Sequence, residues 1–137
     1  MKYRLMDILA CPYDKSFPLR LIVFSERRYE HRQVKFKKVP ACELYCGLKR
    51  KSVEELSPGE VDCEDCIKLE VVDGVLICER CKRWFPIRDE IPILLPDELR
   101  KRNEDLKFMQ KYKDRFPEDV LREGRPFNLS DLGEEQS

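Results

Sequence analysis

The stretch LICERCKRWFPIRDEIPILLP, residues 76–96, sets a Cys-x-x-Cys turn directly before a long apolar run. Cys78 and Cys81 lie between two apolar segments, and Ile91-Pro92-Ile93-Leu94-Leu95 predicts a strand. Two thiolates on one tight turn can supply half of a tetrahedral zinc shell, in which Zn–S distances are about 2.3 Å. The same spacing is also that of a redox dithiol or a disulfide. A zinc site here needs two further ligands from another part of the chain.

Composition bounds the class of protein. A chain of 137 residues, 42% of them hydrophobic, is long enough for one domain with a modest core. No apolar run approaches the length of a membrane span, and the first residues do not form a secretory signal, so we expect a cytoplasmic protein without membrane contact. In that compartment seven cysteines favour metal ligation over disulfides. The sequence contains no catalytic triad, phosphate loop or metalloprotease motif, and we do not expect an enzyme.

The other half of a zinc shell is predicted near the N-terminus. Residues 5–9 give one apolar face of a short helix, which Cys11-Pro12 ends. Cys11 and Asp14 have the spacing of a zinc knuckle, with a carboxylate in place of the second thiol. Asp14 is equally consistent with an ordinary turn residue. The first candidate metal site therefore consists of Cys11, Asp14, Cys78 and Cys81.

A second set of cysteines lies in the middle of the chain: Cys42, Cys46, Cys63 and Cys66. Residues 43–56 predict a helix, which Ser57-Pro58-Gly59 ends. Two cysteine pairs with this spacing can bind one Zn²⁺ as a four-thiolate site. Two disulfides, for example Cys42 with Cys66 and Cys46 with Cys63, are the alternative. We therefore expect one or two zinc ions per chain.

The remaining segments predict a small antiparallel sheet. Residues 17–24 and 34–39 are β-rich and are expected to pair as a long hairpin. Asp73-Gly74 between β-branched residues predicts a type I′ turn, and residues 84–87 give a further strand. The expected fold class is α+β. The N- and C-terminal parts of the core form a zinc-ribbon-like sheet, to which a cysteine-rich helical insertion and a C-terminal helix are added.

We expect four regions: residues 1–40 with 67–99 as a zinc-binding β domain, 41–66 as the insertion, 100–123 as a helical extension and 124–137 as a disordered tail. The extension, with a helix starting at Asp97, carries a narrow apolar stripe: Leu99, Leu106, Met109, Tyr112 and Phe116. The stripe fits a helix packed on its own domain, or alternatively a helix that binds a partner.

Opposite charges are separated along the chain. Residues 20–51 are rich in Arg and Lys, whereas residues 52–79 are rich in Asp and Glu. The basic segment could bind RNA through Arg27, Arg28, Arg32, Lys35, Lys37 and Lys38. The alternative is a solvated face that pairs with the acidic segment. His31, the only histidine, lies here, and we treat it as a surface residue.

The apolar run at residues 91–95 predicts a partner surface. It is longer than one face of a small sheet can bury, and Pro92 lacks the N–H that a central strand would use, so we expect the run at a sheet edge. An exposed apolar edge is normally covered, for instance by a strand from another chain. The predicted partner-binding residues are Phe85, Ile91, Pro92, Ile93, Leu94 and Leu95.

Several of these segments together resemble the multifunctional methyltransferase subunit (tRNA methyltransferase 112) family. The resemblance rests on Cys11-Pro12 after a short helix, Phe17-Pro18-Leu19-Arg20-Leu21, residues 69–78 and residues 84–96. It implies that Cys11, Cys78 and Cys81 bind a metal with a fourth ligand, and Asp14 stands near the position where that family usually has a Cys. Residues 42–66 would occupy the place of a helical insertion in that family.

The resemblance also implies a function. The chain would be a non-catalytic zinc-binding subunit that stabilises and activates S-adenosylmethionine-dependent methyltransferases modifying tRNA, rRNA or a translation release factor. Its partner would be a methyltransferase catalytic subunit in a heterodimer, and it would meet RNA only through that partner. The alternatives are a zinc-ribbon RNA- or ribosome-binding module and a dithiol redox protein. Salt dependence separates the first two hypotheses, because electrostatic RNA binding weakens steeply with salt.

Overall fold

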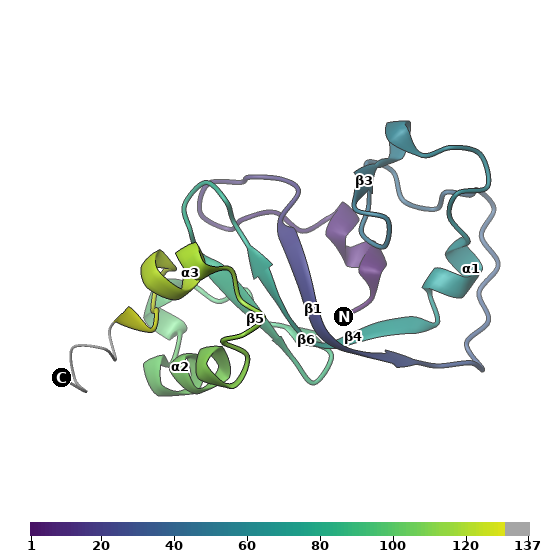
Figure 1. Ribbon diagram of the computed structural model, residues 1–137. Helices are drawn as coiled ribbons and strands as arrows, with labels where there is room; N and C mark the ends of the chain where they lie inside the picture. Colours follow the sequence, from purple (N-terminus) through teal and green to yellow (C-terminus); the bar gives the residue numbers. More distant parts are fainter. Residues whose placement is uncertain (131–137) are drawn as a thin grey trace.

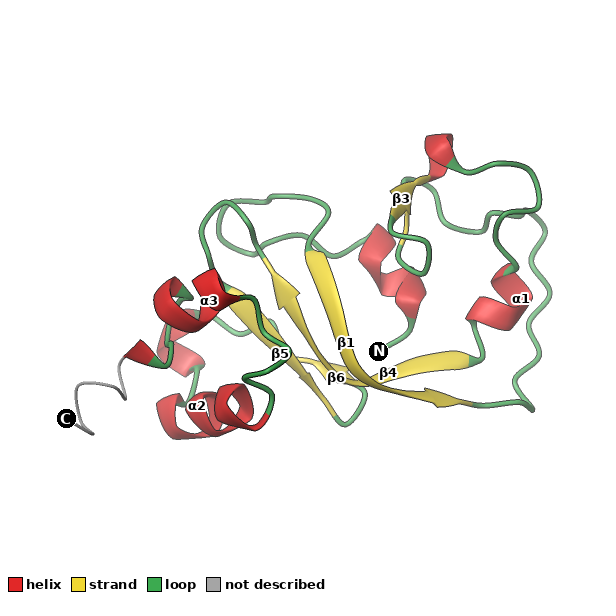
Figure 2. Ribbon diagram, viewed as in Figure 1, coloured by secondary structure: helices red, strands yellow, loops and turns green. Residues whose placement is uncertain are grey.

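A four-stranded antiparallel sheet forms the centre of the protein in a computed structural model that describes residues 1–130 (Figure 1). The strands, in spatial order, are β1 (Arg20–Arg28), β4 (Leu69–Ile77), β5 (Trp84–Arg88) and β6 (Ile91–Pro92). Short helices surround this sheet (Figure 2). The expected α+β class with an antiparallel sheet is confirmed.

Strand β4 runs straight through Asp73 and Gly74, so the predicted type I′ turn is wrong. The strand pairs with β1 on one side and with β5 on the other, and its register against β1 shifts on both sides of Ser25. A Cβ atom on Gly74 would lie 2.6 Å from the carbonyl oxygen of Ile22. The glycine therefore permits the close approach of two strands at an irregular register.

Residues 34–39 form an irregular segment, and the predicted hairpin between residues 17–24 and 34–39 is also wrong. β1 takes β4 as its partner, with Leu21 opposite Leu76. The physical reason is burial, because Val71 and residues 75–77 of β4 are apolar and fully buried, with side chains on both faces of the strand. The alternating pattern of residues 34–39 offers no comparable contact, and Val34 and Val39 stay exposed.

The side chains of the sheet pack into two hydrophobic layers. One layer holds the N-terminal segment with the 3₁₀ helix η1 (Tyr3–Asp7) against one set of strand residues: Leu76, Phe85 and Ile87. The other layer holds α2 (Arg102–Lys111) and α3 (Glu118–Glu123) against the alternate set: Val75, Ile77 and Trp84. Figure 1 shows η1, in purple, on one side of the sheet and α2 and α3 on the other.

The C-terminal apolar stripe packs on its own domain, which was one of the two expectations. Met109 and Phe116 are buried in the cluster that contains Trp84, and Tyr112 packs against it. Leu106 is also buried, whereas Leu99 remains 59% exposed. Leu99 belongs to the 3₁₀ turn η3 (Asp97–Leu99), and α2 begins only at Arg102. Among the described residues, no helix combines the length and the apolar character needed to cross a membrane.

Residues 124–130 do not form the disordered tail that we expected. The Trp84 N–H donates to the Arg125 carbonyl over 3.1 Å, and the Arg125 N–H donates to the Lys82 carbonyl over 2.9 Å. The indole N–H of Trp84 donates to the Phe127 carbonyl over 2.8 Å. A buried indole N–H requires a hydrogen-bond acceptor, and this bond helps to hold residues 124–130 in place. The rest of the expected tail, residues 131–137, lies outside the described residues.

The insertion forms no helix over residues 43–56, contrary to the prediction. It folds as a short hairpin, β2 (Tyr45–Cys46) and β3 (Lys51–Ser52), followed by the 3₁₀ turn η2 (Val53–Glu55) and by α1 (Cys63–Cys66). The hairpin docks on η1, where the Asp7 carboxylate accepts three backbone N–H groups: Glu43, Leu44 and Tyr45. This tertiary contact outweighs the local helix propensity.

Candidate metal centre and docking edge

Two turns of the same construction bring the first candidate metal ligands together. In each turn the N–H of the fifth residue donates to the carbonyl of the first over 2.9 Å: Lys15 to Cys11, and Lys82 to Cys78. The fourth residue of one turn is Asp14, and the fourth residue of the other is Cys81. Asp14 therefore has the same position in its turn that the candidate ligand Cys81 has in the second turn.

Four ligand atoms from these turns converge on one point. The Cys11 Sγ atom lies 3.7 Å from the Cys81 Sγ atom, and the Cys78 Sγ atom lies 3.4 Å from each carboxylate oxygen of Asp14. All four ligand atoms lie within 4.8 Å of one another, and no other group of three or more Cys, His, Asp or Glu within residues 1–130 is as close. A tetrahedral ion with Zn–S bonds of about 2.3 Å separates two sulfurs by about 3.8 Å. The donor set therefore fits a zinc ion.

Burial and hydrogen bonds act differently on three of the candidate ligands. Burial raises the pKa of the Cys11 thiol to about 12. The N–H of Ser16 donates to Asp14 over 2.9 Å, and this bond holds the pKa of that carboxyl below its usual range. Burial also opposes ionisation of Cys81, but hydrogen bonds from Arg83 outweigh it, and the pKa of this thiol is lowered. A bound cation would favour the ionised form of every ligand.

Arg83 ties the two turns together, a role that the sequence analysis missed. Its guanidinium carbon lies 3.6 Å from the centre of the Tyr13 ring, and its Nη2 pairs with the Asp97 carboxylate at 2.8 Å. The Asp97 N–H donates to the Tyr13 hydroxyl over 2.6 Å, which closes a three-residue network beside the ligands. No local pattern marks Arg83, because one of its two partners lies in the distant N-terminal turn.

The second set of cysteines lies together in the insertion, although more loosely than the first. All seven cysteines are free thiols. Burial raises the pKa of Cys66 to about 12, and the neighbouring thiols add to the shift: Cys46, Cys42 and Cys63. Among the described residues, only the first set has three or more ligand atoms within 4.8 Å of one another. Metal binding by the second set therefore stays a prediction.

The apolar run at residues 91–95 lies at the sheet edge, as predicted. Within residues 1–130, β6 is the last strand of the sheet and pairs only with β5. The Ile93 N–H extends this pairing by donating to the Pro86 carbonyl over 2.9 Å. Ile91 is 62% exposed and Leu95 is 39% exposed.

The other predicted partner-binding residues are less accessible. Pro92, Ile93 and Leu94 are partly buried, and Leu94 packs against the core. Phe85 is fully buried in the core below the sheet, so its assignment as a partner-binding residue is wrong. Its position in β5 places its side chain toward the N-terminal segment, because residues alternate between the two faces of a strand.

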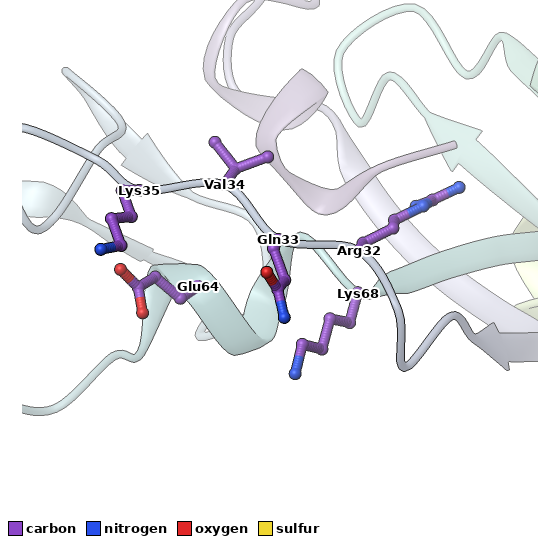
Figure 3. Close-up of a pocket in the computed structure, with 6 residues that line it drawn as sticks. All are labelled: Arg32, Gln33, Val34, Lys35, Glu64 and Lys68. Carbon is purple, nitrogen blue, oxygen red and sulfur yellow. The ribbon is translucent and has the colours of Figure 1, made fainter.

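The basic segment lies beside the acidic α1 region and borders a pocket of about 330 Å³ (Figure 3). The lining residues are Arg32, Gln33, Val34, Lys35, Glu64 and Lys68. Arg32 is engaged by Glu70 at 2.9 Å, and Arg28 pairs with Asp65. These ion pairs favour the expectation that basic side chains neutralise the acidic segment, although residues 34–39 are not a strand.

The chain is similar in sequence to known proteins. The model of a family described as "Trm112p-like protein" matches residues 2–90, which include both cysteine sets. A UPF0434 protein of Dechloromonas aromatica (strain RCB) is 42% identical over 43 residues, which are 31% of this chain and 74% of that protein. A UPF0434 protein of Nitrosococcus oceani (strain ATCC 19707 / BCRC 17464 / JCM 30415 / NCIMB 11848 / C-107) is 36% identical over 39 residues, 28% of this chain and 66% of that protein.

Proposed function

The chain belongs to the Trm112p-like family, and from this premise we propose that it is a non-catalytic, zinc-binding regulatory subunit of a methyltransferase. In this proposal it binds, stabilises and activates an S-adenosylmethionine-dependent enzyme that modifies tRNA, rRNA or a translation release factor. Family membership and the Cys/Asp cluster support a small methyltransferase-associated module with a possible metal site. The proposal adds the heterodimer with a methyltransferase, the activation of that enzyme and the location in the cytoplasm.

The observation that carries the proposal is the exposed apolar edge at β6. Ile91 and Leu95 present aliphatic side chains to solvent beside a strand with one open side. A strand from the partner's sheet would pair with that open side and cover these side chains. Burying one large aliphatic side chain contributes about 1.5–3 kcal/mol. Because Ile91 is 62% and Leu95 is 39% exposed, covering both is equivalent to burying about one such side chain, a change of about tenfold to a hundredfold in affinity. A charged residue in either place would cost more.

A cavity of about 190 Å³ next to this edge adds to the proposed docking surface. Its apolar lining is Ile93, Leu95 and Leu99, and charged residues such as Arg88 and Glu104 border it. A side chain of the partner placed there would meet an apolar floor with a polar rim. This arrangement is typical of protein interfaces.

The metal's part in the proposal is structural. When bound, zinc would cross-link two turns, one before β1 and one between β4 and β5. Residues of the chain already bring the two turns together, because Arg83 of the second turn packs on the ring of Tyr13 in the first. Strand β5 begins directly after the second turn, and β6 pairs with β5. A fixed second turn therefore helps to fix the docking edge.

RNA is contacted only through the partner in this proposal. The basic residues Arg28 and Arg32 are engaged by acidic side chains of the chain itself. Phosphate binding would have to compete with these pairs.

Purification with a tag at the C-terminus tests the proposal. The tag belongs there because the Met1 ammonium is buried and bonds to the Val71 and Glu90 carbonyls at 2.7 and 2.6 Å. We expect a methyltransferase in stoichiometric amount, and we expect its transfer of methyl groups from S-adenosylmethionine to rise when the purified chain is added. Recovery of RNA that is lost at high salt, without a methyltransferase, would contradict the proposal and favour the RNA-binding module.

A further inference from the structure

The proposed function leaves the four cysteines of the insertion without a role. Cys42 precedes β2, Cys46 lies in β2, and Cys63 and Cys66 are the first and last residues of α1. The fold brings the two pairs together: the Ala41 N–H donates to the Cys63 Sγ atom over 3.3 Å, and Cys46 packs in the same buried cluster as Cys63.

The insertion has too small an apolar core to hold its shape by burial. Its hydrophobic cluster has three buried residues, and two of them are cysteines: Cys46, Val61 and Cys63. The residues around this cluster are only partly buried. Small units of this kind usually depend on a metal or on disulfides. The cysteines are therefore placed where a cross-link is needed.

A cavity of about 20 Å³ lies between the N-terminal segment and the insertion, and three of these cysteines border it. Cys42, Cys63 and Cys66 all contribute to its wall. A space of roughly 10–15 Å³ is enough for one water molecule. The cavity therefore has room for a single ion bordered by three thiols, with Cys46 buried close by.

Positive charge is also present at the cavity wall. Lys2 and Arg4 line the cavity, and the guanidinium carbon of Arg4 lies 5.8 Å from the centre of the Phe36 ring. A divalent ion with four thiolates is a doubly negative centre. Arg4 beside it would offset part of that charge, whereas two disulfides would be neutral. Lys2 contributes less, because its ammonium already pairs with Glu70 at 3.3 Å.

We infer that Cys42, Cys46, Cys63 and Cys66 form a second metal site, which binds one Zn²⁺ or another thiophilic divalent ion. The four thiols release their protons to solvent, and four sulfur–metal bonds form without any change in oxidation state. The sulfurs are more widely spaced than those of the first site, so binding draws them inward around the cavity. The site would tie α1 to the β2–β3 hairpin. This inference does not depend on the methyltransferase role.

Native mass spectrometry of the full chain, purified without oxygen and loaded with Zn²⁺, tests the inference. It counts bound ions, and it also detects disulfides because each one removes two hydrogens from the mass. We expect two ions and seven reduced cysteines in the unaltered chain. Cys46→Ser with Cys66→Ser should retain one ion. The reciprocal variant, Cys78→Ser with Cys81→Ser, should also retain one.

Two results would overturn the inference. One is a fully reduced chain that holds a single ion and keeps it in the Cys46→Ser, Cys66→Ser variant. The other is a chain isolated with Cys42, Cys46, Cys63 and Cys66 joined as disulfides. Should the variant fold poorly, titration of the unaltered metal-free chain with Co²⁺ decides the matter. Two equivalents with thiolate-to-cobalt absorption support the second site, and saturation at one equivalent rejects it.

Discussion

The Sγ atoms of Cys11 and Cys81 lie 3.7 Å apart, although the two residues are separated by 70 positions in the chain. One ligand turn precedes β1 and the other joins β4 to β5. The pairing of β1 with β4 and of β4 with β5 therefore brings the two turns together. Metal binding at this centre and folding of the sheet are therefore coupled.

Asp14 is expected to act as the fourth metal ligand. The substitution Asp14→Asn keeps an oxygen that can accept the Ser16 N–H but removes the carboxylate charge. Loss of an outer-shell partner typically costs about 10–100-fold in metal affinity, so loss of a ligand should cost more than about 100-fold. Competition with a zinc chelator measures the affinity.

The matched variant is Asp14→Cys, which makes the two turns alike in their ligands. It should bind zinc at least as tightly as the unaltered chain. If Asp14→Asn binds zinc as tightly as the unaltered chain, Asp14 is only a turn residue.

Removal of the buried Glu70 charge should destabilise the fold. The Glu70 carboxylate pairs with the Met1 ammonium at 2.6 Å and with Arg32 at 2.9 Å, and its side chain is 5% exposed. Glu70→Gln leaves these cations without their counter-charge, which typically costs about 3–5 kcal/mol. Urea unfolding at pH 7 measures the difference in the free energy of unfolding.

The pH dependence of this difference has a definite sign. Burial opposes ionisation of Glu70, but hydrogen bonds from the Met1 ammonium and Arg32 outweigh it, and the pKa of Glu70 is lowered. The stability that it contributes is present above the unfolded-state pKa of about 4.3 and is lost as the pH falls through the folded-state pKa. The difference between the unaltered chain and Glu70→Gln should therefore begin to narrow below about pH 4 and close only below the folded-state pKa. A gap that stays constant from pH 7 to pH 3 would contradict this account.

Gly74 is expected to be required for the pairing of β1 with β4. Gly74→Ala would place a methyl group 2.6 Å from the Ile22 carbonyl oxygen, and backbone atoms cannot move aside as a flexible side chain would. The expected cost is about 2–3 kcal/mol in the free energy of unfolding. Gly59→Ala is the control, because its Cβ meets nothing within 4 Å and only its positive φ of 77° is unfavourable. Equal costs for the two substitutions, measured by urea unfolding, would argue against a close approach at Gly74.

The sequence alone predicted those features that depend on local chemistry. Cys78 and Cys81 could be recognised from their spacing, and Cys11 and Asp14 from a similar spacing. Pro92 indicated an edge strand because it has no N–H to donate, and the sheet order agrees.

The incorrect predictions concern contacts between distant residues. Asp73-Gly74 has the composition of a turn, but β1 and β5 flank it and keep the strand extended. Residues 43–56 have helical composition, but the carboxylate of Asp7, which lies 36 positions before Glu43, accepts the N–H groups of residues 43–45, and a short hairpin follows. Phe85 has the character of an interface residue, but the sheet directs it inward. None of these competing contacts can be read from the local pattern.

The affinity of the chain for its methyltransferase, measured by calorimetry, tests the central claim most directly. Ile91→Asp with Leu95→Asp removes the two most exposed side chains of the run at residues 91–95. The control is Ile8→Asp with Leu44→Asp, which changes two exposed aliphatic residues away from β6. The account predicts a loss of about a hundredfold or more for the edge variant and a change of less than about threefold for the control. The account would be contradicted if the edge variant kept its affinity and the partner were instead released by reversing the charges of Lys35, Lys37 and Lys38.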